Sequence, residues 1–268
     1  MIPVLLIGAA GRMGREVVKA VHHDPQTHLV GAIGQSSAGR DAGEVAGIGT
    51  IGLEIGADLG AVIENCGARV AVDFSLPSVV QSNIRALLNA KIAPVVGTTG
   101  LSQADLDTLD ADAKQAGVPV LVAPNFAIGA ILMMRFAAEA SKYFEMAEII
   151  EYHHEKKLDA PSGTAFKTAV VMREARGADF ERVGGDEIED NSTAPHARGG
   201  EMGGISIHSV RLPGFLAHQE VIFGLAGQTL NIRHDTITRE CYMPGVLLAI
   251  KKIGDLPAGL HFGLETVL

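Results

Sequence analysis

The sequence has few cysteines and fewer positively than negatively charged residues. Each shortage argues against a class of protein. It has two cysteines, Cys66 and Cys241, which lie far apart and form no Cys-x-x-Cys motif. Two such residues are typical of reduced thiols in an intracellular protein. The 22 lysines and arginines are outnumbered by 31 aspartates and glutamates, so the formal net charge is −9. This balance argues against nucleic acid as a partner.

Long apolar runs are also missing. No run approaches the roughly 20 residues that span a membrane. The apolar start, residues 2–7, has no basic flank and is unlike a signal peptide. We therefore expect a cytoplasmic protein with no membrane partner. With 47% hydrophobic residues over 268 positions, the chain can bury a core without disulfides or metals.

The first half of the chain alternates short β-rich runs with helical patterns. This alternation predicts an α/β fold with a parallel sheet and helices on both faces. Strands are predicted at 4–7, 29–33, 53–55, 70–74, 93–96 and 118–122. Helices are predicted at 13–21, 58–65, 77–90 and 103–116. Pro77 suits a first helical turn, and Ser102 suits a helix cap.

The regular alternation of strands and helices ends after residue 126, where an α+β domain is predicted. Helices are expected at 127–143, 162–176 and 244–251, and strands at 148–152, 205–210, 220–225 and 230–233. Because no crossover helices fit between the last three strands, that sheet should be largely antiparallel. The polar, glycine-rich stretch 184–204 is expected to be a mobile loop.

A glycine-rich turn directly follows the first predicted strand. Residues 8–14 read Gly-Ala-Ala-Gly-Arg-Met-Gly, between a strand and a helix. Gly8 allows a tight turn, Gly11 lets backbone N–H groups approach a pyrophosphate, and Gly14 lets helix and strand pack closely. The helix N-terminus adds partial positive charge, and Arg12 adds a full one. This context favours a dinucleotide site over a merely structural turn.

The end of the second strand bears on the choice between NADH and NADPH. An acidic residue there would bind the adenosine 2′-hydroxyl of NADH and repel a 2′-phosphate. This chain has Gly34-Gln35-Ser36-Ser37 instead, with Arg40 shortly after. Ser36, Ser37 and Arg40 can each bind a phosphate, which favours NADPH, although an ordinary loop explains the run nearly as well.

Two further segments follow strands at the sheet edge where cofactors bind. They are Gly97-Thr98-Thr99-Gly100 and Ala123-Pro124-Asn125-Phe126. Small and hydroxyl residues there would let the nicotinamide half of the cofactor approach the backbone. Taken alone, either segment is typical of a plain turn.

The densest group of reactive side chains lies in residues 151–164, which read Glu-Tyr-His-His-Glu-Lys-Lys-Leu-Asp-Ala-Pro-Ser-Gly-Thr. The last four residues open a helix and form an anion site, where Gly163 and Thr164 would anchor a carboxylate. Lys157 and His154 would add positive charge. Histidine and lysine also deliver protons near neutral pH. Reduction of an imine needs such a group besides a hydride.

Plainer explanations exist for each part of this cluster. The adjacent histidines suit a surface pair, the lysines a solvated cluster, and Ser162 an ordinary helix cap. Zinc is a further option, because Glu151, Glu155 and Asp159 are near. The histidines lack the i, i+4 spacing of zincins and no thiolate is close, so we expect no metal. Beside a dinucleotide site, the whole cluster favours catalysis.

At these residues the sequence resembles the 4-hydroxy-tetrahydrodipicolinate reductase family, also called dihydrodipicolinate reductase, over essentially its whole length. The shared segments are 8–14, 73–75, 97–100, 124–126, 151–164, 208–214, 218–220 and 232–234. The run 153–164 is highly specific to this family, whereas the glycine turn alone is not. Many members carry an acidic residue where this chain has Gln35-Ser36. Of the properties that the resemblance implies, cofactor preference is therefore the one least supported for this chain.

The resemblance implies an oxidoreductase of lysine and diaminopimelate synthesis. Hydride would pass from NADPH or NADH to 4-hydroxy-tetrahydrodipicolinate, a small anionic dicarboxylate, with loss of water. His153 would be the catalytic acid/base and Lys157 the proton donor, while His154, Gly163 and Thr164 would bind the substrate carboxylates. The implied cofactor-binding residues are Gly8, Ala9, Ala10, Gly11, Arg12, Met13, Gly97, Thr98, Thr99, Ala123, Pro124, Asn125 and Phe126.

The resemblance also implies a domain plan. Residues 1–126 would form a Rossmann-type dinucleotide-binding domain, rejoined by residues 237–268. Residues 127–236 would form a substrate-binding and oligomerisation domain whose sheet builds a homotetramer. Two rival functions share the glycine turn: an amino-acid dehydrogenase acting on an imine, and a non-catalytic NADPH-binding regulator. The intact His153 and Lys157 argue against the regulator.

Overall fold

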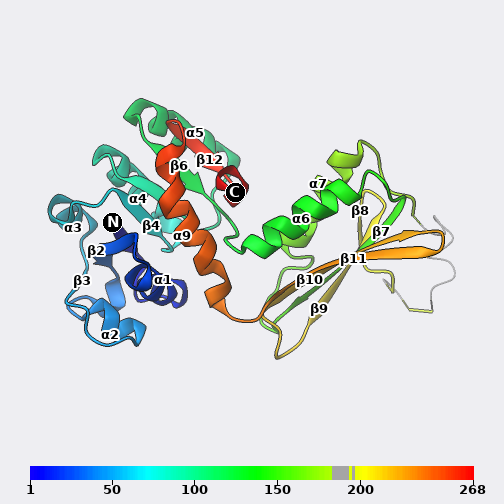
Figure 1. Cartoon of the computed structure of the whole chain (residues 1–268), viewed down its shortest axis with the longest axis horizontal. Helices are drawn as coiled ribbons and strands as arrows, with labels where there is room; N and C mark the ends of the chain where they lie inside the picture. The colour runs from blue at the N-terminus through cyan, green and yellow to red at the C-terminus, as the bar shows by residue number, and fades with distance from the viewer. Residues whose placement is uncertain (183–192, 195–196) are drawn as a thin grey trace. The chain divides into compact units, whose positions relative to one another are not determined.

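A computed structural model describes residues 1–182, 193–194 and 197–268. The chain divides into two compact units, Met1–Ile128 with Arg239–Leu268, and Gly129–Thr238. Figure 1 shows the elements of both units, coloured along the chain. Within the described residues, no helix combines the length and apolarity that crossing a membrane requires.

The first unit is built on a parallel sheet whose seven strands, within the described residues, lie in the order β12-β6-β5-β4-β1-β2-β3. Each pairing along this order is parallel. The strands are β1 (Ile2–Ile7), β2 (Thr27–Ile33), β3 (Ile55–Gly56), β4 (Val70–Asp73), β5 (Ala93–Val96), β6 (Pro119–Val122) and β12 (Gly259–Phe262). The predicted parallel sheet and Rossmann-type fold class are confirmed.

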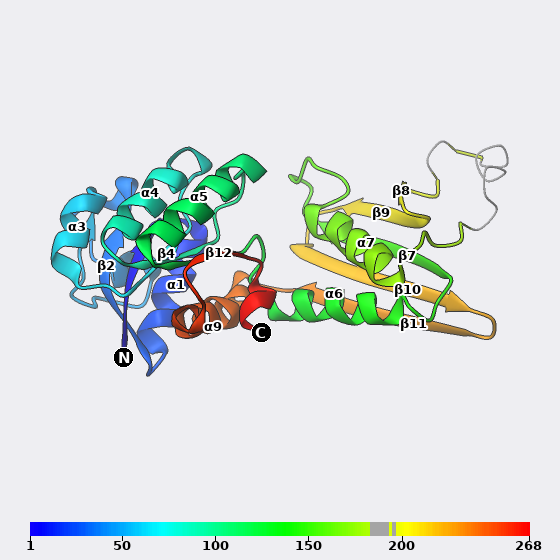
Figure 2. The same cartoon turned by 90° about the horizontal axis from the view of Figure 1, so that it is seen from above.

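Helices cover both faces of this sheet. They are α1 (Arg12–His23), α2 (Ala42–Ala46), α3 (Leu59–Cys66), α4 (Pro77–Asn89), α5 (Gln103–Ala116) and α9 (Met243–Lys252). In Figure 2, α3, α4 and α5 lie on one face, and α1 and α9 on the other. Both faces are therefore buried, which explains why Val4, Leu5 and Leu6 of β1 are consecutive apolar residues with no exposed surface.

The predicted helix boundaries have clear local causes. Pro77 stands in the first turn of α4, as predicted, where its missing N–H costs nothing. Ser102 caps α5, also as predicted, and Asp105 completes the capping box by accepting from the Ser102 backbone N–H. Gly117 ends α5 in the left-handed conformation.

The strand order reverses beside β1. The chain runs from β1 outward to β2 and β3, then returns to place β4, β5 and β6 on the other side of β1. In open α/β sheets, ligands bind at the carboxyl ends of the strands at such a switch point. The turns after Ile7 and after Asp73 both begin there.

The second unit, as far as its residues are described, is a mixed sheet with helices α6 and α7. Its described strands follow the order β11-β10-β7-β9-β8. They are β7 (Met146–His153), β8 (Gly200–Met202), β9 (Ile205–Arg211), β10 (Ala217–Leu225) and β11 (Gln228–Thr236), with helices α6 (Ile128–Ala140) and α7 (Gly163–Arg176). Pairing is antiparallel except between β7 and β9, which α7 joins as a crossover. The prediction of a largely antiparallel sheet is thus confirmed with that exception.

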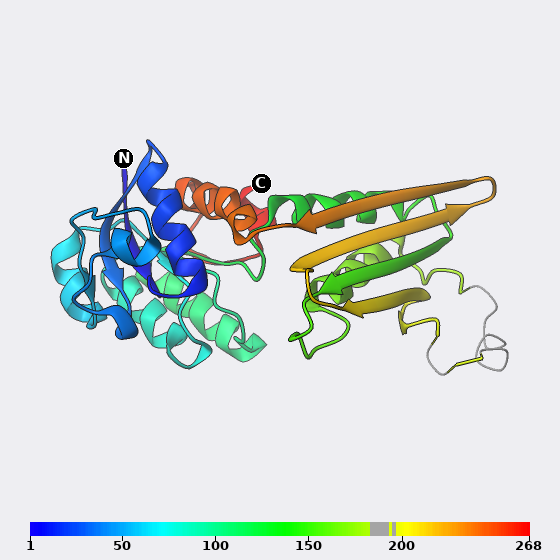
Figure 3. The same ribbon diagram turned by 90° about the horizontal axis from the view of Figure 1, so that it is seen from below.

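The two faces of this second sheet differ. Helices α6 and α7 lie behind the sheet in Figure 3, so the nearer face is not covered by either of these two helices. Alternation along β7 follows from this arrangement: Ala147, Ile149 and Glu151 are buried, whereas Ile150 and Tyr152 are only half-buried. The buried side chains toward the helices form one core: Ala137, Ala147, Ile149, Ala165, Ala169, Met172, Phe180, Ile205, Ile207, Val221 and Phe223.

Two differences from the sequence prediction concern short strands. Most of the stretch predicted as a mobile loop, 184–204, lies outside the described residues. At its end the prediction is wrong, because Gly200–Met202 pairs with β9 as β8. Strand β12 was not predicted either. It is four residues long and contains Gly259 and His261, so only its pairing with β6 makes it a strand.

Candidate active site

The glycine turn between β1 and α1 has the geometry of an anion site. Gly8 adopts φ +89°, and a Cβ there would lie 2.5 Å from the carbonyl oxygen of Phe74. A Cβ on Gly14 would lie 2.0 Å from the carbonyl oxygen of Gly8. Both positions therefore require glycine. The first backbone N–H groups of α1 have no intrahelical acceptor, and Gly11 and Arg12 beside them are exposed.

Phe74 is where the loops after β1, β4, β5 and β6 meet. Its carbonyl contacts the Gly8 turn, and a Cβ on Gly97 would lie 2.0 Å from its ring. The rings of Phe74 and Phe126 lie 5.7 Å apart between centroids. The structure thus brings three predicted cofactor-binding segments of the first unit together around a residue that the prediction did not include.

Asp73 holds these loops in place. It has no exposed surface. Its carboxylate accepts from the Ser75 backbone N–H at 2.7 Å, from Asn83 Nδ2 at 2.9 Å and from Thr98 Oγ1 at 3.1 Å. Because Thr98 is buried and already donates to Asp73, its side chain serves the loop, and the exposed Thr99 beside it is the more accessible hydroxyl.

The other predicted cofactor-binding residues fall into two groups, one buried and one with exposed surface. Ala9, Ala123 and Phe126 are buried, so they shape the backbone. Asn125 accepts the Ala127 backbone N–H at 2.9 Å and stabilises the turn. The remaining predicted residues keep some exposed surface: Gly8, Ala10, Gly11, Arg12, Met13, Gly97, Thr99 and Pro124. With its glycine cradle, helix terminus and small residues, this edge fits a dinucleotide.

The loop after β2 forms a short 3₁₀ helix, Gln35–Ser37. Gln35 Nε2 donates to the carbonyl oxygen of Ala57 at 3.0 Å, which anchors the loop. Ser37 is only 8% exposed. Ser36 and Arg40 are exposed, so these two remain the accessible candidates for a 2′-phosphate.

In the second unit, a buried carboxylate organises the predicted catalytic cluster. His153, the last residue of β7, has a side chain that is 15% exposed. Its Nδ1 lies 2.5 Å from Oε2 of Glu151, two residues earlier on the same face of the strand. Glu151 itself has no exposed surface. His153 and Glu151 thus form a hydrogen-bonded pair.

Arg211, from the end of β9, completes this pair. Its Nη1 and Nη2 donate to the two carboxylate oxygens of Glu151 at 2.8 and 2.7 Å. Burial alone would raise the pKa of Glu151, but hydrogen bonds from His153, Arg211 and Ser209 outweigh it and lower the pKa to about 2. The carboxylate is therefore ionised at neutral pH.

Lys157 lies in the loop after β7 and is held by Asp159. Its Nζ contacts both carboxylate oxygens of Asp159, at 2.8 and 2.7 Å. The hydrogen bond from Lys157 lowers the pKa of Asp159. Arg211 Nη2 also donates to the Asp159 carbonyl at 2.7 Å. The loop that carries Lys157 is thereby tied to the same arginine as Glu151.

Helix α7 begins beside this group. Ser162 is its N-cap and accepts the Ala165 backbone N–H at 3.2 Å, while its own backbone N–H donates to Glu151 Oε1 at 3.1 Å. The plain interpretation of Ser162 as a cap therefore holds. Gly163 is exposed, and among the described residues nothing lies within 4 Å of where its Cβ would be. Open space and free N–H groups at this helix start fit a carboxylate.

Two family models match the chain. One, described as "Dihydrodipicolinate reductase, N-terminus", matches residues 2–126, and the other, "Dihydrodipicolinate reductase, C-terminus", matches residues 129–268. The chain belongs to the dihydrodipicolinate reductase family. The predicted family is thus confirmed.

Relatives match this dihydrodipicolinate reductase chain along its whole length. Proteins named 4-hydroxy-tetrahydrodipicolinate reductase from Desulfitobacterium hafniense and from a Synechocystis species are 47% and 48% identical to it, covering 100% of this chain and 98% of each relative. A solved structure, the dipicolinate-bound dihydrodipicolinate reductase from Paenisporosarcina sp. TG-14, is 37% identical, with a TM-score of 0.86 and full coverage of both chains.

More distant structures share the fold of this dihydrodipicolinate reductase chain. An amine dehydrogenase from Mycobacterium smegmatis has a TM-score of 0.66 at 13% identity, covering 97% of this chain and 94% of its own. At that identity the likeness establishes the fold alone.

The sequence prediction for this family member missed Glu151 and Arg211 as site residues. The sequence presents Glu151 as a possible metal ligand and as part of the shared segment 151–164, and Arg211 as part of the shared segment 208–214, with no role assigned to either in catalysis or binding. The position of Glu151 two residues before His153 was an available signal, because alternate residues of a strand share a face. Arg211 is 60 residues away from Glu151 in sequence, so no local pattern pairs them.

Proposed function

We propose that this chain is a 4-hydroxy-tetrahydrodipicolinate reductase, in which residues 151–164 bind the substrate and supply its proton. The observation that carries the proposal is the Glu151–His153 pair beside the open start of α7. One segment thereby presents an acid/base group and an anion site within the same unit. The family relationship supports the same reaction.

Substrate carboxylates would bind at the start of α7. The backbone N–H groups at Gly163 and Thr164 lack intrahelical acceptors, and the helix dipole favours negative charge there. The name of the dipicolinate-bound relative supports a dicarboxylate ligand for this chain. His154, in the loop after β7, would add a further donor for a carboxylate.

Protons would come from His153 and Lys157. An imidazolium at His153 would be stabilised by the ionised carboxylate of Glu151, so it can give a proton and regain one. Lys157 is cationic and partly exposed, with a side chain that is 22% exposed. When Lys157 donates its proton, its contact with Asp159 would be replaced by a contact with the substrate.

A nicotinamide dinucleotide, when bound, supplies the hydride. The first backbone N–H groups of α1, with Arg12, would hold its pyrophosphate. Gly97, Thr99 and Pro124 would line its nicotinamide half. We extend this proposal to a preference for NADPH, because Ser36 and Arg40 are exposed where an acidic residue would repel the 2′-phosphate.

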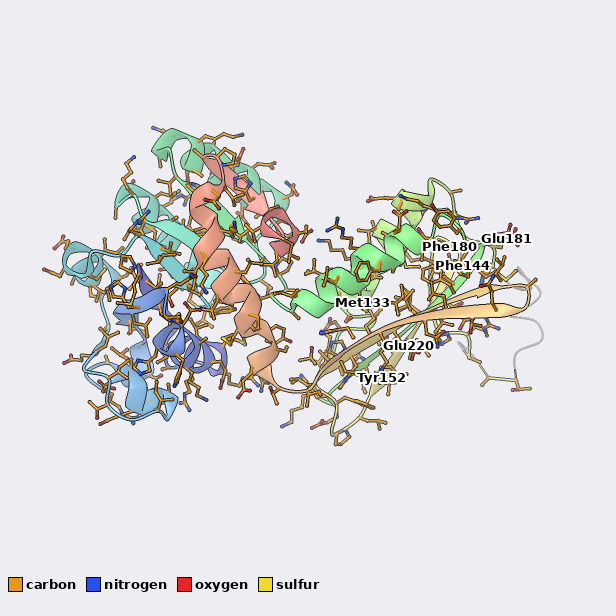
Figure 4. All side chains as sticks on the ribbon, in the orientation of Figure 1. Met133, Phe144, Tyr152, Phe180, Glu181 and Glu220 are labelled. Carbon is orange, nitrogen blue, oxygen red and sulfur yellow. The ribbon has the colours of Figure 1, made fainter. Side chains whose placement is uncertain are left out.

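A homotetramer built through the second sheet completes the proposal. The face away from α6 and α7 carries the half-buried apolar residues Ile150, Tyr152, Val210 and Ile222. Figure 4 labels Tyr152 of β7 and Glu220 of β10 on these strands. Apolar area of this kind is stabilised when it is covered, and a second copy of the chain would cover it. We place the enzyme in the cytoplasm.

The deciding experiment follows the absorbance of NADPH and of NADH while the labile substrate is made in situ. Pyruvate, aspartate semialdehyde and the preceding synthase generate it, and a matched reaction omits the synthase. Synthase-dependent oxidation would establish the reaction and rank the two cofactors. If folded protein binds a cofactor but oxidises neither, the amino-acid dehydrogenase and the regulator become the better explanations.

A further inference from the structure

We propose that Glu151 is the positioning residue of the site, holding His153 with its proton on Nδ1 so that Nε2 exchanges protons with the substrate. This inference rests on the function proposed above and assigns a role to a residue outside the expected set. It concerns a residue that acts through His153 and does not itself touch the substrate.

The protonation of the His153 ring follows from its contact with Glu151. The distance between Nδ1 and Oε2 is 2.5 Å. An ionised carboxylate only accepts hydrogen bonds, so Nδ1 must carry the donated proton. In the neutral ring, Nε2 is then left with the lone pair. When the ring takes up a second proton, that proton resides on Nε2.

The remaining contacts of Glu151 keep its carboxylate from rotating. Arg211 occupies both oxygens from β9, and the Ser162 backbone N–H binds Oε1 from the start of α7. The carboxylate therefore joins three elements at one point. It sets the distance between the His153 ring and the anion site at the start of α7.

Charged groups from the neighbouring elements also bear on the His153 ring. They are Glu151 on β7, Arg211 on β9, and His154, Lys157 and Asp159 in the loop that follows β7. On β10, the residue paired with His153 is Ala217, which carries no charge. Arg211 and Asp159 each have an oppositely charged partner. Glu151 is the one with a hydrogen bond to the ring.

The other face of the same strand offers a matched comparison. Glu148 also contacts a histidine and an arginine, His208 Nε2 at 2.8 Å and Arg198. That trio does not include the start of α7. Glu148→Gln therefore removes a carboxylate with the same kinds of partner from the same strand, without touching His153.

The test compares Glu151→Gln, Glu151→Asp and Glu148→Gln with the unaltered protein, each checked for oligomeric state and melting temperature. An amide can accept from Nδ1–H or donate to Nδ1, so Glu151→Gln no longer selects one ring tautomer. We expect kcat to fall about 10–100-fold, the range found for carboxylates that orient metal-binding histidines through the same kind of hydrogen bond. The KM for the cofactor should stay unchanged.

Two readouts separate positioning from a merely structural role. The ¹⁵N spectrum of labelled histidine, with the His153 signals assigned through His153→Gln, should show Nδ1–H in the free protein and mixed tautomers in Glu151→Gln. The second readout is rescue: Glu151→Asp keeps a carboxylate that only accepts hydrogen bonds, so it should restore part of kcat and of the Nδ1–H signal. Glu148→Gln should change neither.

An unchanged tautomer in Glu151→Gln, with loss of stability alone, would overturn the inference. So would equal effects of Glu148→Gln. The spectrum is recorded without substrate, so it tests the role of Glu151 independently of the reaction. If the unaltered protein shows the Nδ1–H tautomer but no synthase-dependent oxidation, the proposed function fails and the positioning of His153 stands.

Discussion

At the level of single residues, some glycines are required by backbone packing, and another is explained better by the approach of a ligand. Gly8 and Gly14 are required by the fold, because any Cβ there would overlap backbone atoms. Gly163 is different: it does not have a positive φ, and its missing Cβ leaves open space. A glycine that packing does not require, at an exposed helix start, points to close approach by a ligand.

Replacing Gly163 by alanine tests that interpretation. We expect stability to stay equal or rise by about 0.5–1 kcal/mol, since alanine restricts the unfolded chain without strain in the fold. The KM for substrate should rise at least about tenfold, because the methyl group would take the space of a carboxylate. Steady-state kinetics and urea unfolding measure the two effects. Gly254→Ala, which also meets nothing within 4 Å among the described residues, is the control, and equal KM values in both variants would argue against the site.

Arg40 allows a residue-scale test of cofactor choice. Arg40→Ala should raise the KM for NADPH and leave that for NADH nearly unchanged, because only NADPH carries the 2′-phosphate. The protein should fold normally, since the side chain is exposed and it is the Arg40 backbone that bonds to Ser37 and Ile55. Equal changes for both nucleotides would show that Arg40 does not contact this phosphate.

At the scale of elements, one buried carboxylate joins β7, β9 and the start of α7. Secondary structure places Glu151, Arg211 and Ser162 on separate elements, and the hydrogen bonds among them close the end of the sheet where the site lies. Because Glu151 is fully buried, its charge is stabilised by these partners and not by water. The free energy of unfolding of this unit should therefore decrease as the pH becomes acidic.

The sign of that dependence follows from the depressed pKa of Glu151, which is lowered from 4.5 to about 2. A carboxylate with a lower pKa in the folded state contributes its full stabilisation above the unfolded pKa and loses it as pH falls toward the folded pKa. We expect a loss of about 3 kcal/mol between pH values near 4.5 and 2. Urea unfolding across this window measures it, and Glu151→Gln should flatten the dependence.

The contact between β1 and α1 gives a second element-scale prediction. A Cβ on Gly14 would lie 2.0 Å from the Gly8 carbonyl oxygen, so Gly14→Ala must push α1 away from β1. The cost should be about 1–3 kcal/mol, as for other overpacked sites. Cofactor affinity should fall as well, since the helix start moves from the pyrophosphate. Calorimetry of NADPH binding checks this. Unchanged affinity in a destabilised variant would remove the helix start from the cofactor site.

At the scale of the whole molecule, the two units carry different halves of the proposed chemistry. The loops proposed to bind the cofactor belong to the unit formed by Met1–Ile128 and Arg239–Leu268, and the proposed catalytic cluster belongs to Gly129–Thr238. The second unit also contains a sheet face that neither α6 nor α7 covers (Figure 3). We relate that face to assembly.

Ile150→Lys tests the assembly of the whole molecule. A lysine there would place charge on the apolar part of the uncovered face, while its cross-strand neighbour Glu220 would keep the single chain folded. If the proposed homotetramer forms through this face, light scattering should show the unaltered protein as a tetramer and Ile150→Lys as smaller species. Tyr143→Lys, at a residue that is 71% exposed outside the sheet, should keep the mass of the unaltered protein. An unchanged mass for Ile150→Lys would contradict the proposal that copies of the chain assemble through this face.

Features that depend on neighbouring residues could be predicted from the sequence alone. The parallel sheet of the first unit, the Gly8 turn, the Ser102 cap and the family assignment all rest on short patterns, and they are confirmed. Local chemistry suffices there, since periodicity and capping depend on residues within a few positions. The roles of His153 and Lys157 remain predictions of the same kind.

Contacts between residues far apart in the sequence are visible only in the folded structure. The partners of Glu151 include Arg211, 60 residues away, and Asp73 receives Thr98 from 25 residues away. Strand β12 exists because β6 offers it backbone partners. None of these contacts leaves a periodic trace in the sequence, because a single side chain or a four-residue strand gains its stability from the partner that folding brings to it.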